Sequence, residues 1–253
     1  MAASTSTYAA PFPDAVTDET THAALMDSVY RRQRYIYDFT RKYYLLGRDR
    51  LIRELNPAPN ARVVEVGCGT ARNLVKMAKR YPGRQFFGLD ASQAMLETAA
   101  RSAAKAGPGH RISLAHGYAE ALTPQMFGQT EPFDDIVFSY SLSMIPDWKQ
   151  ALSAAASALS PSGRIHIVDF GDLRGLAAPA RKALLGWLAL FHVEPRAELL
   201  GALENAAAKN ANLQILPGRY AFLLSCSGDS LSDITGAVAY QSQAADKTRI
   251  FGS

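Results

Sequence analysis

The segment at residues 62–73 constrains the fold of this chain more than any other. It reads Arg-Val-Val-Glu-Val-Gly-Cys-Gly-Thr-Ala-Arg-Asn, so a β-branched apolar run enters a glycine-rich turn and a helix-forming stretch leaves it. A second apolar run, Phe-Phe-Gly-Leu-Asp, ends on the carboxylate of Asp90. Parallel α/β sheets bind nucleotide cofactors at the carboxyl ends of their strands, where such turns and carboxylates meet. The segment therefore predicts a cofactor pocket at that edge of a parallel sheet.

The following residues alternate between short apolar runs and helix-forming stretches. Strands are expected at 63–66, 86–89, 112–115, 135–139 and 164–168, and helices at 72–80, 93–106, 119–126 and 148–159. This alternation is typical of a mostly parallel sheet with helices on both faces. After residue 170 we expect helices at 179–193 and from 195 to about 209, then strands at 213–216 and 220–224. Pro217-Gly218 makes these last strands an antiparallel pair.

The predicted fold class is α/β, with a Rossmann-like, mostly parallel seven-stranded sheet whose last strand is antiparallel. We expect a flexible N-terminus at 1–21, one domain at 22–226 and a polar tail at 227–253. Within the domain, 22–55 would form a helical lid with a break at Gly47, and 61–170 the cofactor core. Residues 171–226 would supply lid helices and the terminal hairpin.

Composition narrows the function classes. A net charge of +4 and a pI near 9.1 are too weakly basic to indicate nucleic-acid binding. Cys68 and Cys226 are the only cysteines, which predicts no disulfide framework or metal site and fits a reducing cytoplasm. Residues 1–10 lack the pattern of a signal peptide, and no apolar run approaches the roughly 20 residues that span a bilayer. We therefore expect a cytoplasmic protein without a metal.

Three kinds of ligand compete for the glycine turn. A dinucleotide site would need Gly-x-Gly-x-x-Gly, but Arg72 stands at the third glycine position. A phosphate loop would need Gly-Lys-Ser or Gly-Lys-Thr at the helix start, which is absent. An S-adenosylmethionine pocket fits an acid two residues before the first glycine, as Glu65 is. The competing structural interpretation makes Asp90 a plain cap for the helix that follows it.

With Glu65, the glycine turn, Asp90 and the C-terminal hairpin, the chain resembles the class I S-adenosylmethionine-dependent methyltransferases over about 63–226. The resemblance implies that the turn faces the methionine part of the cofactor, that Glu65 lies near its ammonium and that Asp90 holds the ribose hydroxyls. Ser139-Tyr140-Ser141, at the end of the fourth strand, should line the sulfonium end. The cofactor-binding residues it implies are Tyr43, Glu65, Gly67, Cys68, Gly69, Asp90, Ala91, Met95, Ala119, Glu120, Ser139 and Tyr140.

Two positions depart from the family pattern. Tyr118 stands where an aspartate that binds the adenine amine is common, so the backbone of Ala119 or the side chain of Glu120 is expected to serve. Ala71 replaces the commonest third glycine, a minor departure because alanine adds only a methyl group. Cys68 is expected to fill space and not to act as a nucleophile.

Four segments carry a narrower resemblance. They are 22–52, which includes Val-Tyr-Arg-Arg-Gln-Arg-Tyr-Ile-Tyr-Asp-Phe, then Ser-Leu-Ser-Met-Ile-Pro-Asp-Trp at 141–148, His-Ile-Val-Asp-Phe-Gly-Asp at 166–172 and Phe-His-Val-Glu-Pro-Arg at 191–196. They are similar to the bacterial betaine-lipid methyltransferases, which trimethylate the amine of diacylglycerylhomoserine. The resemblance implies an N-methyltransferase of betaine lipid biosynthesis, linked to a 3-amino-3-carboxypropyl transferase. The alternatives are another amine, such as phosphatidylethanolamine or a small soluble acceptor, and a nucleotide-binding oxidoreductase.

Methyl transfer to an amine requires alignment of two atoms, exclusion of water and a proton acceptor, and alignment alone contributes several kcal/mol. Aromatic faces tolerate the quaternary ammonium product, at roughly 0.5–2 kcal/mol per contact. The candidate catalytic residues are Tyr37, Tyr140, Asp169 and His192. The candidates for binding a homoserine carboxylate are Arg31, Arg34, Arg41 and Arg196. His166, inside an apolar run, is expected to be a hydrogen-bonded core histidine instead.

A lipid substrate would bring the protein to a membrane surface. Residues 31–54 hold eight Lys or Arg against three acids, a balance that attracts anionic lipid. The apolar side chains of 183–193 could lie at the headgroup boundary, with an ordinary buried lid helix as the alternative. We expect a lipid or amine substrate, no nucleic acid, and peripheral contact with anionic lipid at the inner membrane surface.

Overall fold

A computed structural model describes residues 45–206 and 211–230 of the chain. One seven-stranded sheet lies at its centre, with the strand order β3-β2-β1-β4-β5-β7-β6. The strands are β1 (Arg62–Val66), β2 (Gln85–Asp90), β3 (Ile112–His116), β4 (Phe133–Ser139), β5 (Leu159–Phe170), β6 (Asn212–Ile215) and β7 (Ala221–Ser227). β7 is antiparallel to both of its neighbours, and the other adjacent pairs are parallel. The predicted sheet is confirmed.

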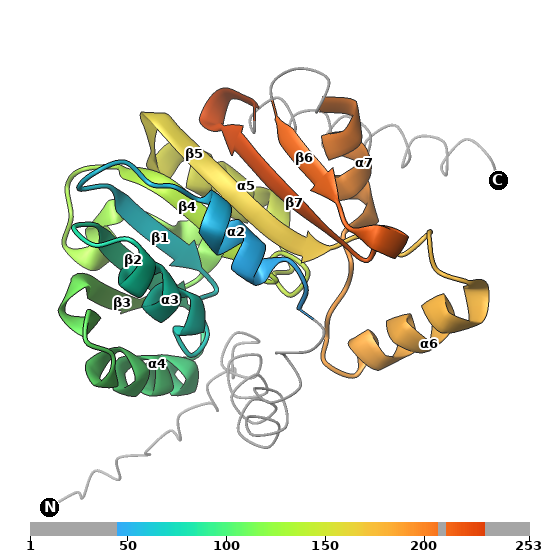
Figure 1. The fold of residues 1–253 in the computed structure, drawn as a ribbon, viewed down its shortest axis with the longest axis horizontal. Helices are drawn as coiled ribbons and strands as arrows, with labels where there is room; N and C mark the ends of the chain where they lie inside the picture. The colour runs from blue at the N-terminus through green and yellow to red at the C-terminus, as the bar shows by residue number, and fades with distance from the viewer. Residues whose placement is uncertain (1–44, 207–210, 231–253) are drawn as a thin grey trace, which may run out of the picture.

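Helices cover both faces of this sheet (Figure 1). One face carries α2 (Arg48–Glu54), α3 (Arg72–Arg80) and α4 (Gln93–Lys105), and the other carries α5 (Trp148–Ala158) and α7 (Ala197–Ala206). The central strands β1, β2, β4, β5 and β7 are therefore largely buried on both sides, which explains why they read as apolar runs, whereas the edge strands β3 and β6 are only partly buried. Gly47 precedes α2 with a φ of +87°, so the predicted break there is confirmed. The remainder of the predicted N-terminal lid lies outside the described residues.

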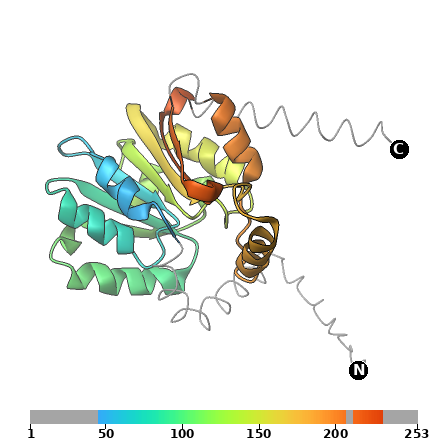
Figure 2. The same ribbon diagram turned by 45° about the vertical axis from the view of Figure 1, so that its right-hand side comes forward.

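α6 (Ala178–Ala189) stands out from the body of the sheet in both views (Figures 1 and 2). Leu188 is 1% exposed and anchors it, whereas most of its other side chains are partly or fully exposed. None of the helices in the described ranges has the length and apolar character needed to cross a bilayer.

One predicted helix is wrong, and two predicted boundaries are wrong by four or five residues. The helix expected at 119–126 is two 3-10 turns, η2 (Ala119–Ala121) and η3 (Pro124–Phe127), because Thr123 is extended ahead of a proline that cannot donate a helical hydrogen bond. α6 ends at Ala189 and not at 193, and a left-handed residue at 192 closes the turn that follows. β5 begins at Leu159, five residues before the predicted start at 164.

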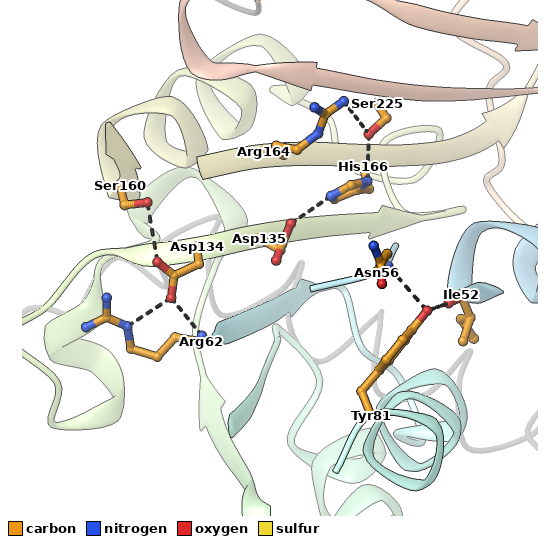
Figure 3. Close-up of polar contacts among 10 residues, drawn as sticks. All are labelled: Ile52, Asn56, Arg62, Tyr81, Asp134, Asp135, Ser160, Arg164, His166 and Ser225. Carbon is orange, nitrogen blue, oxygen red and sulfur yellow. Dashed lines mark hydrogen bonds and ion pairs between the residues drawn. The ribbon is translucent and has the colours of Figure 1, made fainter. Parts of the chain in front are cut away.

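His166 on β5 is a core histidine with both ring nitrogens bonded (Figure 3). Its Nε2 lies 2.9 Å from Asp135 Oδ1 on β4, and its Nδ1 lies 2.9 Å from Ser225 Oγ on β7. Arg164 also donates to Ser225 Oγ, at 3.3 Å. The expectation for His166 is confirmed, and the contacts tie three adjacent strands together.

Candidate cofactor and active site

The turn that follows β1 holds its backbone close to the neighbouring strand ends. The N–H groups of Gly67 and Cys68 both donate to the carbonyl of Leu89 at the end of β2, at 2.8 and 3.0 Å. Gly67 and Gly69 have φ values of +73° and +54°, which favour glycine. A Cβ at position 67 would lie 2.6 Å from Ser141 Cβ, so a side chain is excluded there.

Asp90 ends β2 and connects to the glycine turn. Its Oδ2 accepts from the Gly69 N–H at 2.7 Å, and its Oδ1 accepts from the Ser92 N–H at 2.9 Å. A carboxylate offers about four lone-pair sites, so these two bonds do not exhaust its capacity to accept. Ser92, not Asp90, caps α4, because its Oγ accepts from the Met95 N–H. The interpretation of Asp90 as a plain helix cap is therefore wrong.

Glu65 lies beneath the turn in a buried hydrogen-bond network. Its carboxylate is 2% exposed, and Oε1 accepts from Asn73 Nδ2 at 2.7 Å. The same Nδ2 donates to Ser139 Oγ at 3.1 Å, which joins β1, α3 and β4. Sequence reasoning named Glu65 and Ser139 but missed Asn73. The signal that could have found it is an amide in the first turn of the helix that leaves the glycine turn.

Cys68 is buried between two acidic side chains. Burial first, and then the carboxylates of Asp90 and Glu65, raise the pKa of its thiol well above the usual range. A thiol must ionise to act as a nucleophile. The arrangement therefore favours Cys68 as a space-filling residue.

The end of β3, next to which the adenine contacts were predicted, lies beside Asp90. His116 pairs with Asp90 in the sheet, and the Gly117 N–H donates to the Asp90 carbonyl at 3.1 Å. In the residues that follow Gly117, Tyr118 is 55% exposed and Glu120 is half-buried. Of the other residues predicted to bind the cofactor here, Ala91 is exposed, whereas Met95 and Ala119 are buried.

Tyr140 follows β4 in a left-handed conformation, with a φ of +56°. Its hydroxyl donates to the Leu46 carbonyl at 2.6 Å, and its ring packs edge-on against Phe170 with 4.7 Å between centroids. Burial first, and then the charge of Asp169, raise the pKa of Tyr140 well above its usual range. The hydroxyl therefore stays protonated, and within the described residues it holds the segment before α2.

Ser141 is the next residue of the same loop. Its Oγ is buried next to Gly67 and has no hydrogen-bond partner among the described residues. A buried polar group without a partner is uncommon and indicates a ligand or water. This hydroxyl marks the place where the glycine turn and the β4 loop would meet a bound molecule.

Asp169 fastens the β4 loop to the end of β5. Its Oδ2 accepts from the Ser143 N–H at 3.1 Å, and its Oδ1 accepts from the Phe170 N–H at 2.8 Å. The side chain is 2% exposed, and burial raises its pKa to about 6, although the hydrogen bonds from Ser143 and Phe170 act to lower it.

The predicted acceptor residues are only partly described. Arg196 donates to the carbonyls of Leu142 and Ile145 at 3.2 and 2.8 Å, so it holds the β4 loop instead of standing open to a substrate carboxylate. His192 is exposed at the turn after α6, with a φ of +55°. The other candidates, Tyr37, Tyr43, Arg31, Arg34 and Arg41, lie outside the described residues.

The residues that meet at this edge fit the cofactor that the sequence implies. A half-buried carboxylate at Asp90 suits a diol, a buried carboxylate at Glu65 suits an ammonium, and the turn lets backbone approach closely. Ser141 Oγ adds a hydroxyl that needs a partner. Within 45–206 and 211–230, no three His, Cys, Asp or Glu side chains gather in a way that could hold a metal ion.

Comparison with known proteins finds similarity to methyltransferases. Residues 63–163 match the family model described as a methyltransferase domain. Trans-aconitate 2-methyltransferase of Deinococcus radiodurans is 29% identical over 182 residues, which is 70% of this chain and 60% of that protein. The ubiquinone/menaquinone biosynthesis C-methyltransferase UbiE of Geotalea daltonii is 27% identical over 144 residues, or 54% of this chain and 60% of that one. The chain spans about half the length of the curated relatives it matches.

Two solved structures share the fold. The S-adenosylmethionine-dependent methyltransferase SibL, in its apo form, superposes with a TM-score of 0.58 at 21% identity, over 76% of this chain and 57% of that one. An O-methyltransferase family 2 protein of Planctomyces limnophilus, solved with apigenin, gives a TM-score of 0.56 at 22% identity, over 83% of this chain and 66% of that one.

Proposed function

We propose that this chain, whose residues 63–163 are a methyltransferase domain with S-adenosylmethionine as cofactor, trimethylates the amine of diacylglycerylhomoserine. The product would be the betaine lipid diacylglyceryl-N,N,N-trimethylhomoserine. The observation that carries the methyl-donor half is the convergence of Glu65, the glycine turn and Asp90 at one sheet edge. The acceptor half rests on the four segments similar to the betaine-lipid methyltransferases.

Bound S-adenosylmethionine supplies an electrophilic methyl group on a sulfonium. In this proposal Asp90 accepts from the ribose hydroxyls while it holds the Gly69 N–H, and Glu65 pairs with the cofactor ammonium. The absence of a side chain at Gly67 keeps the turn within reach of Ser141, where the methyl group would be exposed to the acceptor. Alignment and water exclusion then carry most of the catalysis.

The acceptor would approach along the loop after β4. Asp169 and Arg196 fix that loop from two sides, which makes it rigid enough to orient a substrate. His192 is exposed two residues before Glu194, whose N–H donates to the Ser143 carbonyl, so we propose it as the proton acceptor. Tyr37 stays a prediction as a catalytic residue, and Tyr43 stays a prediction as a cofactor-binding residue.

Membrane contact is the second part of the proposal. α6 exposes Arg181 and Lys182 at its start, and Leu190 just beyond its end is 67% exposed. Cationic and apolar groups on one exposed helix suit an anionic lipid surface. Vesicle flotation should then depend on anionic lipid and fall with salt; no flotation under any condition would remove this part and leave the methyltransferase proposal standing.

The names of the relatives suggest other methyl acceptors for this chain. A carboxylate acceptor follows from the trans-aconitate enzyme, a ring-carbon acceptor from the quinone enzyme, and a different amine from the sequence alternatives. The deciding experiment is co-expression with an aminocarboxypropyl transferase that makes diacylglycerylhomoserine, followed by lipid mass spectrometry. A headgroup that gains three methyl groups supports the proposal, and one that stays unmethylated rejects the lipid acceptor.

Two controls complete this experiment. The Asp90→Ala variant should leave the headgroup unmethylated, since Asp90 is placed in the cofactor pocket. In parallel, the purified chain should be assayed with labelled S-adenosylmethionine and trans-aconitate, a demethylated menaquinone or phosphatidylethanolamine. Transfer to one of these alone would reassign the acceptor while keeping the methyl-donor half.

A further inference from the structure

We propose that Asn73 is a positioning residue that fixes the Glu65 carboxylate for the α-amino group of the methyl donor. This inference rests on the proposed function, because it concerns how the same pocket recognises the amino-acid end of its cofactor. Asn73 is 7% exposed in the first turn of α3, so it acts through Glu65 and does not reach the bound molecule from the surface.

The amide of Asn73 has only one workable orientation. Its Oδ1 accepts from Arg72 Nη1 at 3.0 Å, and a guanidinium can only donate. Its Nδ2 donates to Glu65 Oε1 at 2.7 Å, and an ionised carboxylate can only accept. Flipping the amide would create two repulsive contacts, so the chemistry of the neighbours determines which atom faces Glu65.

Ser139 uses the second Nδ2 proton, at 3.1 Å, and this bond extends the arrangement to β4. The buried amide therefore joins β1, which carries Glu65, to β4, whose end would lie beside the methyl group of a bound donor. Removing the amide would release Glu65 Oε1 and Ser139 Oγ together, in a region where hydrogen bonds are strong because water is excluded.

Arg72 connects this network to α2. Its Nη2 lies 3.2 Å from Asp49 Oδ1 on α2, and Lys76 Nζ binds the same oxygen at 2.8 Å. These ion pairs are exposed and contribute little stability. They instead hold the guanidinium of Arg72 in place against α2, and so help to fix the orientation of the Asn73 amide.

The neutral donor leaves the charge of Glu65 intact. An amide satisfies one carboxylate oxygen without cancelling the negative charge, whereas a lysine or arginine at position 73 would neutralise it. The bond from Asn73 therefore does not itself remove the negative charge that would attract an ammonium group. The network thus provides a fixed carboxylate for the amino-acid end of the cofactor, separate from the Asp90 site for ribose.

A binding experiment with two ligands can distinguish the site for the amino-acid end of the cofactor from the site for its ribose. S-adenosylhomocysteine carries the amino-acid group, and methylthioadenosine lacks it. Measured by calorimetry, the Asn73→Ala variant should bind S-adenosylhomocysteine about tenfold more weakly or worse, because it loses a hydrogen bond to a charged group. Its affinity for methylthioadenosine should fall by less than about threefold. Equal losses for both ligands, or no loss for either, would overturn the proposal.

Asn73→Asp keeps the side-chain shape and adds a readout that packing alone would not move. Two carboxylates would share the site, so one of them binds a proton more readily and the protonated pair restores the missing hydrogen bond. S-adenosylhomocysteine affinity of this variant, relative to the wild type, should therefore recover as pH falls from roughly 8 to roughly 5. A relative affinity that stays constant with pH would contradict the positioning role.

Tyr81→Phe is the matched control. Tyr81 Oη donates to the Ile52 carbonyl at 2.7 Å and joins the end of α3 to α2, away from Glu65 (Figure 3). Its loss should reduce stability without changing the affinity for either ligand. If Tyr81→Phe weakens S-adenosylhomocysteine as much as Asn73→Ala does, the effect is general and the inference fails. If the wild type binds neither ligand, the proposed function itself fails.

Discussion

Asp169 should make the free energy of unfolding fall as pH rises. Its folded-state pKa of about 6 lies above the ordinary value of 3.8, so the folded protein binds this proton more tightly than the unfolded chain. The stabilisation is therefore complete below about pH 4 and is lost as pH rises through 6. A difference of about two pH units at about 1.4 kcal/mol each gives about 3 kcal/mol.

Asp169→Asn isolates this contribution, because asparagine is neutral throughout the range. Urea unfolding of both proteins from about pH 4 to about pH 7 should show the wild type losing about 3 kcal/mol relative to the variant. Any constant cost of the substitution, such as a lost bond to the Ser143 or Phe170 N–H, cancels in this comparison. A difference that is flat with pH, or of opposite slope, would refute the reasoning.

Asp172→Asn supplies a control of opposite sign. Burial acts to raise the pKa of Asp172, but hydrogen bonds and charge from Arg219 outweigh it and hold the pKa below 3.8. The stability that Asp172 contributes should therefore be present above about pH 4 and lost as pH falls below that value. Opposite slopes in the two variants would show that the pH effect belongs to each carboxyl and not to the whole protein.

Two further expectations concern the glycine turn. Ala71 is fully buried with a φ of +62°, so Ala71→Val should destabilise the protein by about 2 kcal/mol or more, whereas Ala71→Gly should stay within about 1 kcal/mol. Equal unfolding free energies for the two variants would contradict the strained backbone. Cys68 should resist alkylation by iodoacetamide in the native protein and react only after unfolding. Rapid labelling of the native state would contradict the burial and the raised thiol pKa.

Local signals predicted the fold wherever they agreed with long-range pairing. α3 begins at Arg72 and ends at Arg80 as expected, because the glycine turn precedes it and Pro82-Gly83 follow its last turn. The early start of β5 was missed because Pro161-Ser162-Gly163 reads as a turn. The structure instead pairs Leu159 with Phe133 on β4, across a register shift, so tertiary pairing outweighs the local turn signal.

The site was predictable to the extent that it is made of strand ends. Parallel strands bring their carboxyl ends to one edge, so Glu65 and Asp90 could be placed together from the sequence alone. The roles of Asn73 and Arg196 could not, because they depend on the direction of side chains from separate elements. Ser141 was expected at the sulfonium end from its place after the fourth strand, and the structure adds that its buried hydroxyl has no partner among the described residues.

We infer above all that the edge formed by Glu65, the glycine turn and Asp90 binds the methyl donor. Calorimetry with S-adenosylhomocysteine tests it most directly, with Asp134→Ala as the matched control, because Asp134 also accepts a backbone N–H, from Arg62 at 2.8 Å, at the other end of the strands (Figure 3). The wild type and Asp134→Ala should bind alike, and Asp90→Ala should bind at least about 100-fold more weakly. No binding by the wild type, or unchanged affinity in Asp90→Ala, would contradict the account.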